Sequence, residues 1–467
     1  MKFFIDQHGC AKNQVDGEEI ASRLEDAGHE YVSSGEEADL IIVNTCGFIE
    51  SAKKESIDAA IGIKRYYPGK KLLLAGCLAQ RYPEALLGDM VEADGIFGNA
   101  DLSLAVESAE RTMGGAREAL VPAQPDQIKG HYYGRTRLFG YRGSAHVKIT
   151  EGCSNRCSFC AIPLIRGGLR SRGIEDVVEE CAALIAKGIH EINLIGQDLG
   201  AYGRDLGAPE IPEIGSGAGI ADVTASGHVD IDLPALLRKI AVLPGDFRVR
   251  VLYIHPDHFP WELLEVMKDH PKILPYFDLP FQHASEPLLK AMNRRGSRQK
   301  YTELVARIRE SLPDAMIRST FLVGFPGETE EDFAELRAFQ DETRLDWMGV
   351  FTYSREEGTA AWNMKSRVSK KTANERRKLV EAAQEAITPQ RLTRFVGRTV
   401  EILTEEAVKD AGMSLGRAWM QAPDVDGLTV LKAELPPGSL VSARIVAVNG
   451  LDFEAELIEK VPAAEAR

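Results

Sequence analysis

Short apolar runs alternate with amphipathic stretches over residues 1 to 130. The apolar runs predict strands at Phe3–Ile5, Ala38–Asn44 and Lys71–Ala75. The amphipathic stretches predict helices between them, at Glu18–Ala27 and Ser51–Tyr67. Strands and helices that alternate in this way are typical of an open parallel sheet with helices on its faces. The pattern therefore predicts an α/β domain in the first part of the chain.

A second α/β run occupies residues 139–380. Its apolar stretches predict five strands: Ala145–Thr150, Glu191–Ile195, Phe247–Leu252, Tyr276–Leu279 and Met316–Leu322. Helical patterns lie between them, which is typical of a partial or complete TIM-type barrel whose functional residues lie at the carboxyl ends of the strands. The segment Asp205–Val229 is rich in Gly, Ala and Pro without a clear period. We expect it to be a surface loop inserted into this domain.

The pattern changes again near the C-terminus. Lys370–Leu392 is a charged helical stretch. Four short strands separated by turns are predicted beyond it, at Thr399–Leu403, Gly416–Ala422, Gly427–Lys432 and Leu440–Val448. Such a series is typical of a small antiparallel β-barrel. We therefore expect a third domain over residues 396–463.

Charge narrows the classes of partner. The 467 residues include 70 Asp plus Glu and 56 Lys plus Arg, a formal net charge of −14, and the part from Val396 onward carries twelve acidic and seven basic residues. An acidic surface opposes a phosphate backbone and is better suited to a basic partner. No window approaches the ~20 apolar residues of a membrane span. We expect a cytoplasmic protein that acts away from membranes.

Three of the seven cysteines are closely spaced. Cys153, Cys157 and Cys160 form a C-x3-C-x2-C triad just after a predicted strand. Such a loop can wrap one 4Fe-4S cluster, with three irons bound by thiolates and the fourth free to bind a small molecule through amino and carboxylate groups. The alternative is a zinc site, which usually takes four protein ligands, whereas no His or fourth Cys lies nearby. The triad thus favours an iron-sulfur cluster.

Three other cysteines are far apart in sequence. Cys10, Cys46 and Cys77 each follow a predicted strand of the N-terminal sheet, in loops at the carboxyl ends of those strands, where they can converge. Converged thiolates would hold a second 4Fe-4S cluster, again with one iron free. Three buried structural cysteines are the alternative. Cys181, in the apolar helical stretch Asp176–Lys187, is predicted to be a packed core thiol.

These motifs resemble a known family. The triad, with Phe159 before its last cysteine, resembles the radical S-adenosylmethionine superfamily, and the segments around the other three cysteines resemble the N-terminal domain of the methylthiotransferases. Residues 9–13, 44–49 and 196–198 are similar to the branch that modifies an aspartate of ribosomal protein S twelve, the RimO type. Residues 416–417 and 422–427 resemble a TRAM domain, and apart from the 205–229 insertion the resemblance covers nearly the whole chain.

The resemblance implies an enzyme with two 4Fe-4S clusters, one on the triad and an auxiliary one on Cys10, Cys46 and Cys77. A one-electron reductant such as flavodoxin or ferredoxin would reduce the triad cluster, which would split S-adenosylmethionine into methionine and a 5'-deoxyadenosyl radical. That radical would take a hydrogen from the aspartate β-carbon, and sulfur from the auxiliary cluster would be inserted there. A second S-adenosylmethionine would supply the methyl group, so two are consumed per product.

Two other functions remain open at this point. One is a tRNA methylthiotransferase that acts on isopentenylated adenosine, and the other is a non-enzymatic iron-sulfur protein that binds RNA through the TRAM-like barrel. The acidic C-terminal part favours the basic ribosomal protein as the substrate over a nucleic acid.

Four residues are candidates for binding S-adenosylmethionine. Gln197 and Asp198 follow the strand Glu191–Ile195, a position suited to hydrogen bonds with the methionine or ribose part of the cofactor. The alternative for Asp198 is a turn cap. Alternation sends the side chains of Arg318 and Thr320 to the same face of a strand, where they could bind a carboxylate or form a surface salt bridge.

Arginines also follow the triad, at Arg166, Arg170 and Arg172. They would either contact the cofactor or a substrate carboxylate, or only solvate a loop. His283 is predicted to be a structural hydrogen-bonding residue rather than a proton carrier. We assign no catalytic residue beyond the cluster ligands.

Overall fold

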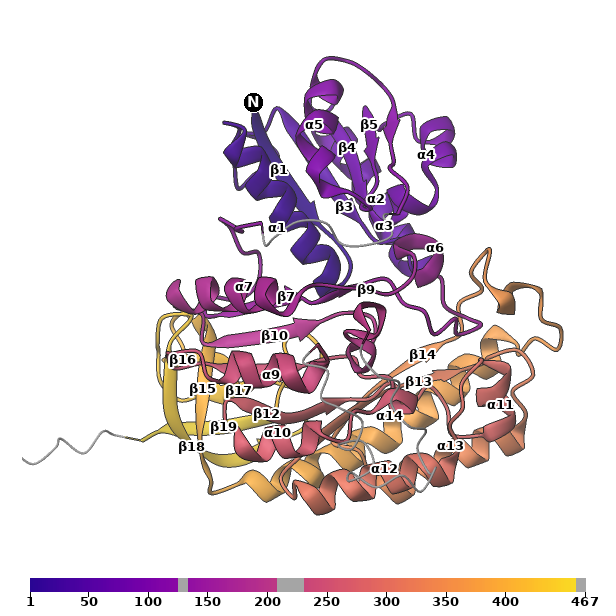
Figure 1. Ribbon diagram of the computed structural model, residues 1–467, viewed down its shortest axis with the longest axis vertical. Coiled ribbons are helices and arrows are strands. Elements are labelled where there is room, and N and C mark those ends of the chain that lie inside the picture. The colour runs from indigo at the N-terminus through magenta and orange to yellow at the C-terminus, as the bar shows by residue number, and fades with distance from the viewer. Residues whose placement is uncertain (125–132, 208–230, 459–467) are drawn as a thin grey trace, which may run out of the picture.

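The computed structural model describes residues 1–124, 133–207 and 231–458. They form an N-terminal α/β unit, a central α/β unit and a C-terminal barrel, in chain order (Figure 1). The predicted 205–229 insertion lies outside the described residues from residue 208 on, and so does the end of the predicted 396–463 domain beyond residue 458. Within the described ranges, no helix combines the length and the hydropathy needed to cross a membrane.

The N-terminal unit is a six-stranded parallel sheet in the order β2-β1-β3-β4-β5-β6. Strand β3 is buried along its whole length, as expected for a parallel strand covered on both faces. Its strands are β1 Lys2–Gln7, β2 Glu30–Tyr31, β3 Leu40–Thr45, β4 Lys71–Gly76, β5 Gly95–Phe97 and β6 Ala119–Leu120. Its helices are α1 Ala11–Asp26, α2 Glu50–Tyr66, α3 Cys77–Arg81, α4 Pro83–Asp89 and α5 Ala105–Met113.

Helix α1 begins seven residues before the predicted start at Glu18. The first turns contain Asn, Asp and Gly, which have low helix propensity, so the sequence pattern alone did not indicate a helix there. Tertiary contacts hold these turns instead. Asn13 Nδ2 donates to the carbonyl oxygens of Asn44 and Thr45, each at 3.2 Å, and thereby ties the helix to the end of β3.

The central unit is an open sheet of six parallel strands, in the order β14-β13-β12-β11-β10-β7, which confirms a partial barrel. Its strands are β7 Ser144–Lys148, β10 Glu191–Ile195, β11 Arg248–Val251, β12 Ile273–Asp278, β13 Met316–Val323 and β14 Trp347–Thr352. A separate two-stranded ribbon pairs β8 Thr150–Glu151 with β9 Arg170–Ser171. The principal helices are α6 Ile162–Arg166, α7 Ile174–Ala186, α9 Leu233–Ala241, α10 Leu263–Asp269, α11 Glu286–Ala291, α12 Arg298–Ser311, α13 Glu330–Thr343 and α14 Lys370–Leu392.

The two faces of the central sheet have different neighbours. Phe277 and Ile317 belong to a large core with the surrounding helices, and Cys181 is fully buried in the same core, as predicted. The alternate residues Tyr276 and Met316 pack in a second core with side chains of the C-terminal barrel. We call the face that carries Tyr276 and Met316 the inner face.

The C-terminal barrel is closed, in the order β15-β16-β17-β19-β18. Its strands are β15 Thr399–Val408, β16 Met413–Ala418, β17 Thr429–Leu431, β18 Leu440–Asn449 and β19 Asp452–Leu457. The predicted small barrel is confirmed, although β17 and β19 pair in parallel and the other pairs are antiparallel. In Figure 1 the barrel, in yellow, packs against the central sheet.

A buried ionic cluster joins the barrel to the central sheet. Glu191, fully buried at the start of β10, binds Arg417 of the barrel at 2.7 Å and Arg248 and Arg250 of β11 at 2.8 and 3.2 Å. Burial alone would raise the pKa of Glu191, but the three guanidinium groups hold it well below the ordinary value. The carboxylate is therefore charged and holds three like charges together.

The Glu191→Gln substitution should weaken this joint. A neutral amide leaves Arg248 and Arg250 without a counter-charge and Arg417 with Glu405 alone, so we expect a loss of about 3–5 kcal/mol in the free energy of unfolding. Because the folded-state pKa of Glu191 is depressed, its contribution is present above the ordinary glutamate pKa of about 4.3 and is lost as the pH falls below it. Urea unfolding at pH 7 and at low pH measures both effects.

The matched control is Glu175→Gln. The Glu175 side chain is 79% exposed and pairs with Lys239, so its loss should change stability by no more than about 1 kcal/mol. Equal effects of the two substitutions at pH 7 would contradict the assignment of Glu191 as the joint.

Candidate active site

Three loops of the N-terminal sheet bring Cys10, Cys46 and Cys77 together. Cys10 precedes the first residue of α1, Cys46 follows β3, and Cys77 is the first residue of α3 rather than a loop residue as predicted. The loops approach so closely that a Cβ atom on Gly9 would lie 3.1 Å from Cys46 Cβ, and one on Gly47 would lie 2.6 Å from the Cys77 carbonyl oxygen. Only glycine fits at residue 47 without a shift of the backbone.

Hydrogen-bond donors point at the buried sulfur of this set. Arg166 Nη2 and Asn99 Nδ2 each lie 3.3 Å from Cys77 Sγ. Burial raises the pKa of Cys77 to about 12 despite the charge of Arg166. Desolvation by the surrounding residues would also raise the pKa of the Cys10 thiol. The positive charges of Lys12 and Arg166 instead hold that pKa below its ordinary value. Three convergent sulfurs with cationic and amide donors fit an anionic iron-sulfur cluster.

The triad loop leaves β8 and crosses to the end of α11. Arg156, between Cys153 and Cys157, has a left-handed backbone with φ of 52°. Asn293 Nδ2 holds this turn by donating to the carbonyl oxygens of Asn155 and Arg156 at 3.2 and 3.0 Å. The loop is therefore fixed at both ends, since α6 begins two residues after Cys160.

Burial raises the pKa values of the three triad thiols, and one buried cation lowers them in part. Burial raises the pKa of Cys153 and of Cys160 to about 12. Burial also raises the pKa of Cys157, an effect that the guanidinium of Arg294 partly offsets. Arg294 is only 5% exposed, so its charge would stabilise a negatively charged cluster. Arg294 was not identified from the sequence, although it lies in a run of basic residues after α11.

The described residues offer no site for a single metal ion: nowhere in them do three His, Cys, Asp or Glu side chains surround one point closely enough. A 4Fe-4S cluster binds each thiolate at a different iron atom, so its ligands stand farther apart than those of one ion.

The two cysteine sets lie next to each other. Cys77 packs in one small apolar cluster with Ala161 and Ile165, and Ala161 directly follows Cys160 of the triad. Phe48, two residues after Cys46, packs against the same cluster. The contact joins the N-terminal unit to the central unit at the two places where sulfur ligands stand.

Arg166 reinforces this contact electrostatically. Besides Cys77, its guanidinium binds Asp16 of α1 at 2.7 Å and Glu151, two residues before the triad, at 3.0 Å. Its side chain is 2% exposed. Arg170 and Arg172 are also paired within the protein, with Gln124 and Asp176 among their partners. The solvated-loop alternative for these three arginines is therefore wrong.

Asp198 is buried beside the triad. It caps the 3₁₀ helix Leu199–Ala201 through Gly200 N at 3.0 Å, and it also accepts hydrogen bonds from His255 N, Asn155 and His258. Burial would raise its pKa, but the hydrogen bond from His258 and its other partners hold it below the ordinary value. The capping role weighed from the sequence is therefore present, and Asp198 also organises three loops around Cys153.

Arg318 and Thr320 share the inner face, as alternation predicted. Arg318 Nη1 lies 3.2 Å from Asp278 and 3.5 Å from Thr320 Oγ1, and Arg318 Nε lies 3.4 Å from Asp426 of the barrel. The pair to Asp426 is buried, not a surface salt bridge. These contacts hold Arg318 on the barrel side of the inner face and do not bring it to Asp198.

Lys12 is a site residue that the sequence analysis did not single out. It lies two residues after Cys10, at the start of α1, and is 7% exposed. Its Nζ donates to the carbonyl oxygen of Gly196 at 2.9 Å and lies 3.9 Å from the centre of the Tyr253 ring. The start of α1, and Cys10 with it, therefore lies against the carboxyl ends of β10 and β11. The only sequence signal was its place beside a candidate ligand.

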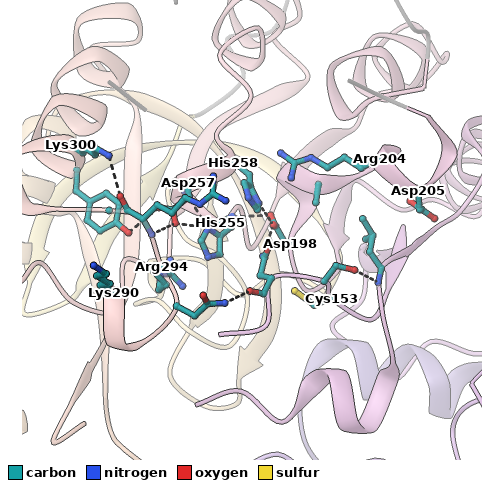
Figure 2. A pocket seen from close by; sticks show the side chains of 18 residues that line it. Cys153, Asp198, Arg204, Asp205, His255, Asp257, His258, Lys290, Arg294 and Lys300 are labelled. Carbon is teal, nitrogen blue, oxygen red and sulfur yellow. Dashed lines mark hydrogen bonds and ion pairs between the residues drawn. The ribbon is translucent and has the colours of Figure 1, made fainter. Parts of the chain in front are cut away.

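A cavity of about 610 Å³ opens on the other side of the triad (Figure 2). Cys153 and Asp198 lie at its wall, and His255, His258 and Arg294 contribute further polar groups. Its lining comes from the triad loop, the loops after β10 and β11, and the segment from α11 to α12. Of the four predicted cofactor contacts, only Asp198 lines it.

Comparison with protein families matches three parts of the chain. Residues 2–98 match the uncharacterized protein family UPF0004, residues 147–339 match the radical SAM superfamily, and residues 396–458 match the TRAM domain.

Several curated relatives align over almost the whole chain. The ribosomal protein uS12 methylthiotransferase RimO of Treponema denticola is 45% identical, over 97% of this chain and 99% of its own. The proteins of the same name from Thermotoga petrophila and Geobacter sulfurreducens are each 39% identical, over 93% and 96% of this chain and 94% and 97% of their own.

Among solved structures, the radical S-adenosylmethionine methyltransferase TsrM from Kitasatospora setae has a TM-score of 0.53 with 17% identity, over 77% of this chain and 76% of its own. This likeness concerns the fold alone.

The Arg166→Gln substitution tests the contact between the two cysteine sets. It leaves the buried carboxylates of Asp16 and Glu151 to share the single positive charge of Lys148, so the free energy of unfolding should fall by about 3 kcal/mol. Chemical denaturation of the iron-free chain measures this. In the control Arg238→Gln, which removes an exposed partner of Glu262, the change should stay below about 1 kcal/mol. A loss no larger than that of the control would show that Arg166 does not join the units.

The pKa values predict how iron binding by the triad depends on pH. Since the pKa of Cys153 and Cys160 is about 12, both are protonated near pH 7 in the iron-free chain and must lose a proton to bind iron. Affinity for ferrous iron should therefore rise between about pH 6.5 and 8.5, by up to about tenfold per unit for each thiol that ionises. Titration of the Cys10→Ala/Cys46→Ala/Cys77→Ala variant isolates the triad. An affinity that is constant over this range would contradict the prediction.

Proposed function

Because the chain belongs to the family of RimO-type ribosomal protein uS12 methylthiotransferases, radical S-adenosylmethionine enzymes with a TRAM domain, we propose that its two cysteine sets hold two 4Fe-4S clusters with separate tasks. Cys153, Cys157 and Cys160 bind the cluster that activates S-adenosylmethionine. Cys10, Cys46 and Cys77 bind the auxiliary cluster. The observation that carries the proposal is the packing of Cys77 against Ala161 and Ile165, directly after the triad.

Radical chemistry requires that the two sets be neighbours. When bound, the triad cluster supplies the electron that cleaves S-adenosylmethionine, and the auxiliary cluster supplies the sulfur that the substrate carbon receives. A carbon radical reacts with whatever is nearest, so the protein must keep both groups within reach of one carbon and keep water away from it. The apolar cluster of Cys77, Ala161, Ile165 and Phe48 excludes water on one side of this space.

We place S-adenosylmethionine at the inner face of the central sheet. Gln197 follows β10 and comes directly after Gly196, whose carbonyl oxygen accepts a hydrogen bond from Lys12. Thr320 offers a hydroxyl on the inner face. Arg318 is the cation for a carboxylate group there, held in place by Asp278. Asp198 supports the site indirectly, because its hydrogen bonds fix the loop that carries Gln197.

The substrate is an aspartate of ribosomal protein uS12, the protein called S twelve above, with the methylthio group inserted at its β-carbon. The relatives that align over nearly the whole chain carry this name at 38–45% identity. The formal charge of −14 suits a basic ribosomal protein. Neither the names of these relatives nor the net charge favours a tRNA substrate or a non-enzymatic RNA-binding role.

Substitution of each cysteine set separates the two tasks. Without Cys153, Cys157 and Cys160, the reconstituted enzyme should form no 5'-deoxyadenosine. With all of Cys10, Cys46 and Cys77 replaced by Ala, it should still form 5'-deoxyadenosine but no methylthiolated uS12, and its iron should fall from about eight to about four per chain. Mass spectrometry of uS12 and chromatography of the cleavage products measure both.

The control is Cys181→Ala, which removes a core thiol outside both sets and should leave both products in place at a modest loss of stability. Methylthiolated uS12 from the chain without Cys10, Cys46 and Cys77 would overturn the two-task proposal. Methylthiolated tRNA with unmodified uS12 would overturn the substrate.

A further inference from the structure

Lys12 is a buried cation without a carboxylate partner among the described residues. The charges of Asp278 and Glu151 reach it, but other cations bind both carboxylates. Arg318 lies 3.2 Å from Asp278, and Arg166 lies 3.0 Å from Glu151. A buried charge without a counter-charge is unfavourable. Lys12 is therefore suited to a ligand that brings a negative charge with it.

The Lys12 ammonium is held in place by two contacts and has a third donor to offer. An ammonium group carries three N–H donors. One of them binds the carbonyl oxygen of Gly196 at 2.9 Å, and the Tyr253 ring covers a second side, with its centre 3.9 Å from Nζ. These contacts fix the ammonium at the carboxyl ends of β10 and β11, and the third donor is left for a ligand.

Side chains other than Lys12 donate to the sulfurs of Cys10, Cys46 and Cys77. Arg166 and Asn99 each lie 3.3 Å from Cys77 Sγ, whereas Lys12 donates to no sulfur within the described ranges. Its side chain extends from α1 to the central unit instead. Cys10 is exposed and Tyr253 is partly exposed, so the surroundings of the ammonium are accessible to a ligand.

We infer that Lys12 binds the side-chain carboxylate of the substrate aspartate through a charge-assisted hydrogen bond and so selects an acidic residue for modification. The inference rests on the proposed function, since it takes uS12 as the substrate. The carboxylate carbon of an aspartate is bonded directly to the β-carbon. A carboxylate bound at Lys12 therefore holds the β-carbon between Cys10, on the side of the sulfur donor, and Gln197, on the side proposed for S-adenosylmethionine. An adenosine has no carboxylate to make this contact.

The test compares the reconstituted enzyme with its Lys12→Gln variant, in which an amide donor remains for the Gly196 carbonyl and the charge is lost. The two probes are uS12 and a form of uS12 with asparagine in place of the modified aspartate. Titration calorimetry without a reductant measures binding in the absence of turnover. The Kd of the unsubstituted enzyme should be about 10–100-fold higher for the asparagine form, as expected for one hydrogen bond to a charged group. The variant should bind both forms with similar, weaker affinity, because the two changes remove the same contact.

The matched control is Lys54→Gln, which removes one positive charge from α2. The Lys54 side chain is 74% exposed and pairs with Asp58, so this variant should prefer the aspartate form of uS12 as strongly as the unsubstituted enzyme does. A second variant, Lys12→Met, removes the charge and the donor at similar side-chain length and should lose the preference as Lys12→Gln does. Circular dichroism and an iron content of about eight per chain show which variants are folded and loaded.

Two results would overturn the inference. One is equal affinity of the unsubstituted enzyme for the two forms of uS12. The other is a preference for the aspartate form that persists in the Lys12 variants; if their iron content or their affinity for S-adenosylmethionine fell at the same time, Lys12 would serve the auxiliary cluster or the cofactor instead. Mass spectrometry of uS12 treated with the unsubstituted enzyme tests the proposed function separately. Methylthiolated uS12 together with a persistent preference would contradict the inference alone, and unmodified uS12 would contradict both.

Discussion

The position of Arg166 is the constraint on which the site depends. Its guanidinium reaches Cys77 of one cysteine set, Glu151 beside the other, and Asp16 in the helix that begins after Cys10. A buried cation of this kind is stable only while every partner stays in place. The contact therefore fixes the relative position of the two α/β units, together with the hydrogen bond of Lys12 to Gly196 and the pair between Lys148 and Asp16. Arg166 is the last residue of α6, which follows the triad directly. Its contacts with Asp16, Glu151 and Cys77 therefore also fix the position of the triad relative to the other three cysteines.

The inner face of the central sheet contacts the C-terminal barrel at the starts of its strands and the N-terminal unit at their ends. At the strand starts, Glu191 and its three arginines attach the C-terminal barrel. At the strand ends, Lys12 lies over Tyr253 and binds the Gly196 carbonyl. The C-terminal barrel thus packs at one end of the inner face and the N-terminal helix at the other, and the polar residues between them are those that we propose bind S-adenosylmethionine.

The sequence was sufficient for what depends on local pattern. The triad could be assigned from its close spacing, and the other three cysteines could be brought together because the carboxyl ends of parallel strands meet at one edge. Helix α14 was predicted with its observed bounds because its period is regular. Strands β14 and β19 were missed, since β14 is half exposed and contains Gly349, and β19 alternates acidic residues with few apolar ones. Partners such as Glu191 and Arg417 could not be paired from sequence, because burial of a charge depends on contacts between residues 226 positions apart.

The central claim is that the two cysteine sets place two clusters side by side. Electron paramagnetic resonance of the fully reduced, reconstituted enzyme tests it most directly, because two paramagnetic clusters held close together broaden and split each other's signals. The account predicts a spectrum that differs from the sum of the spectra of two variants, one lacking Cys10, Cys46 and Cys77 and the other lacking Cys153, Cys157 and Cys160. A spectrum equal to that sum, with about eight irons bound per chain, would contradict it.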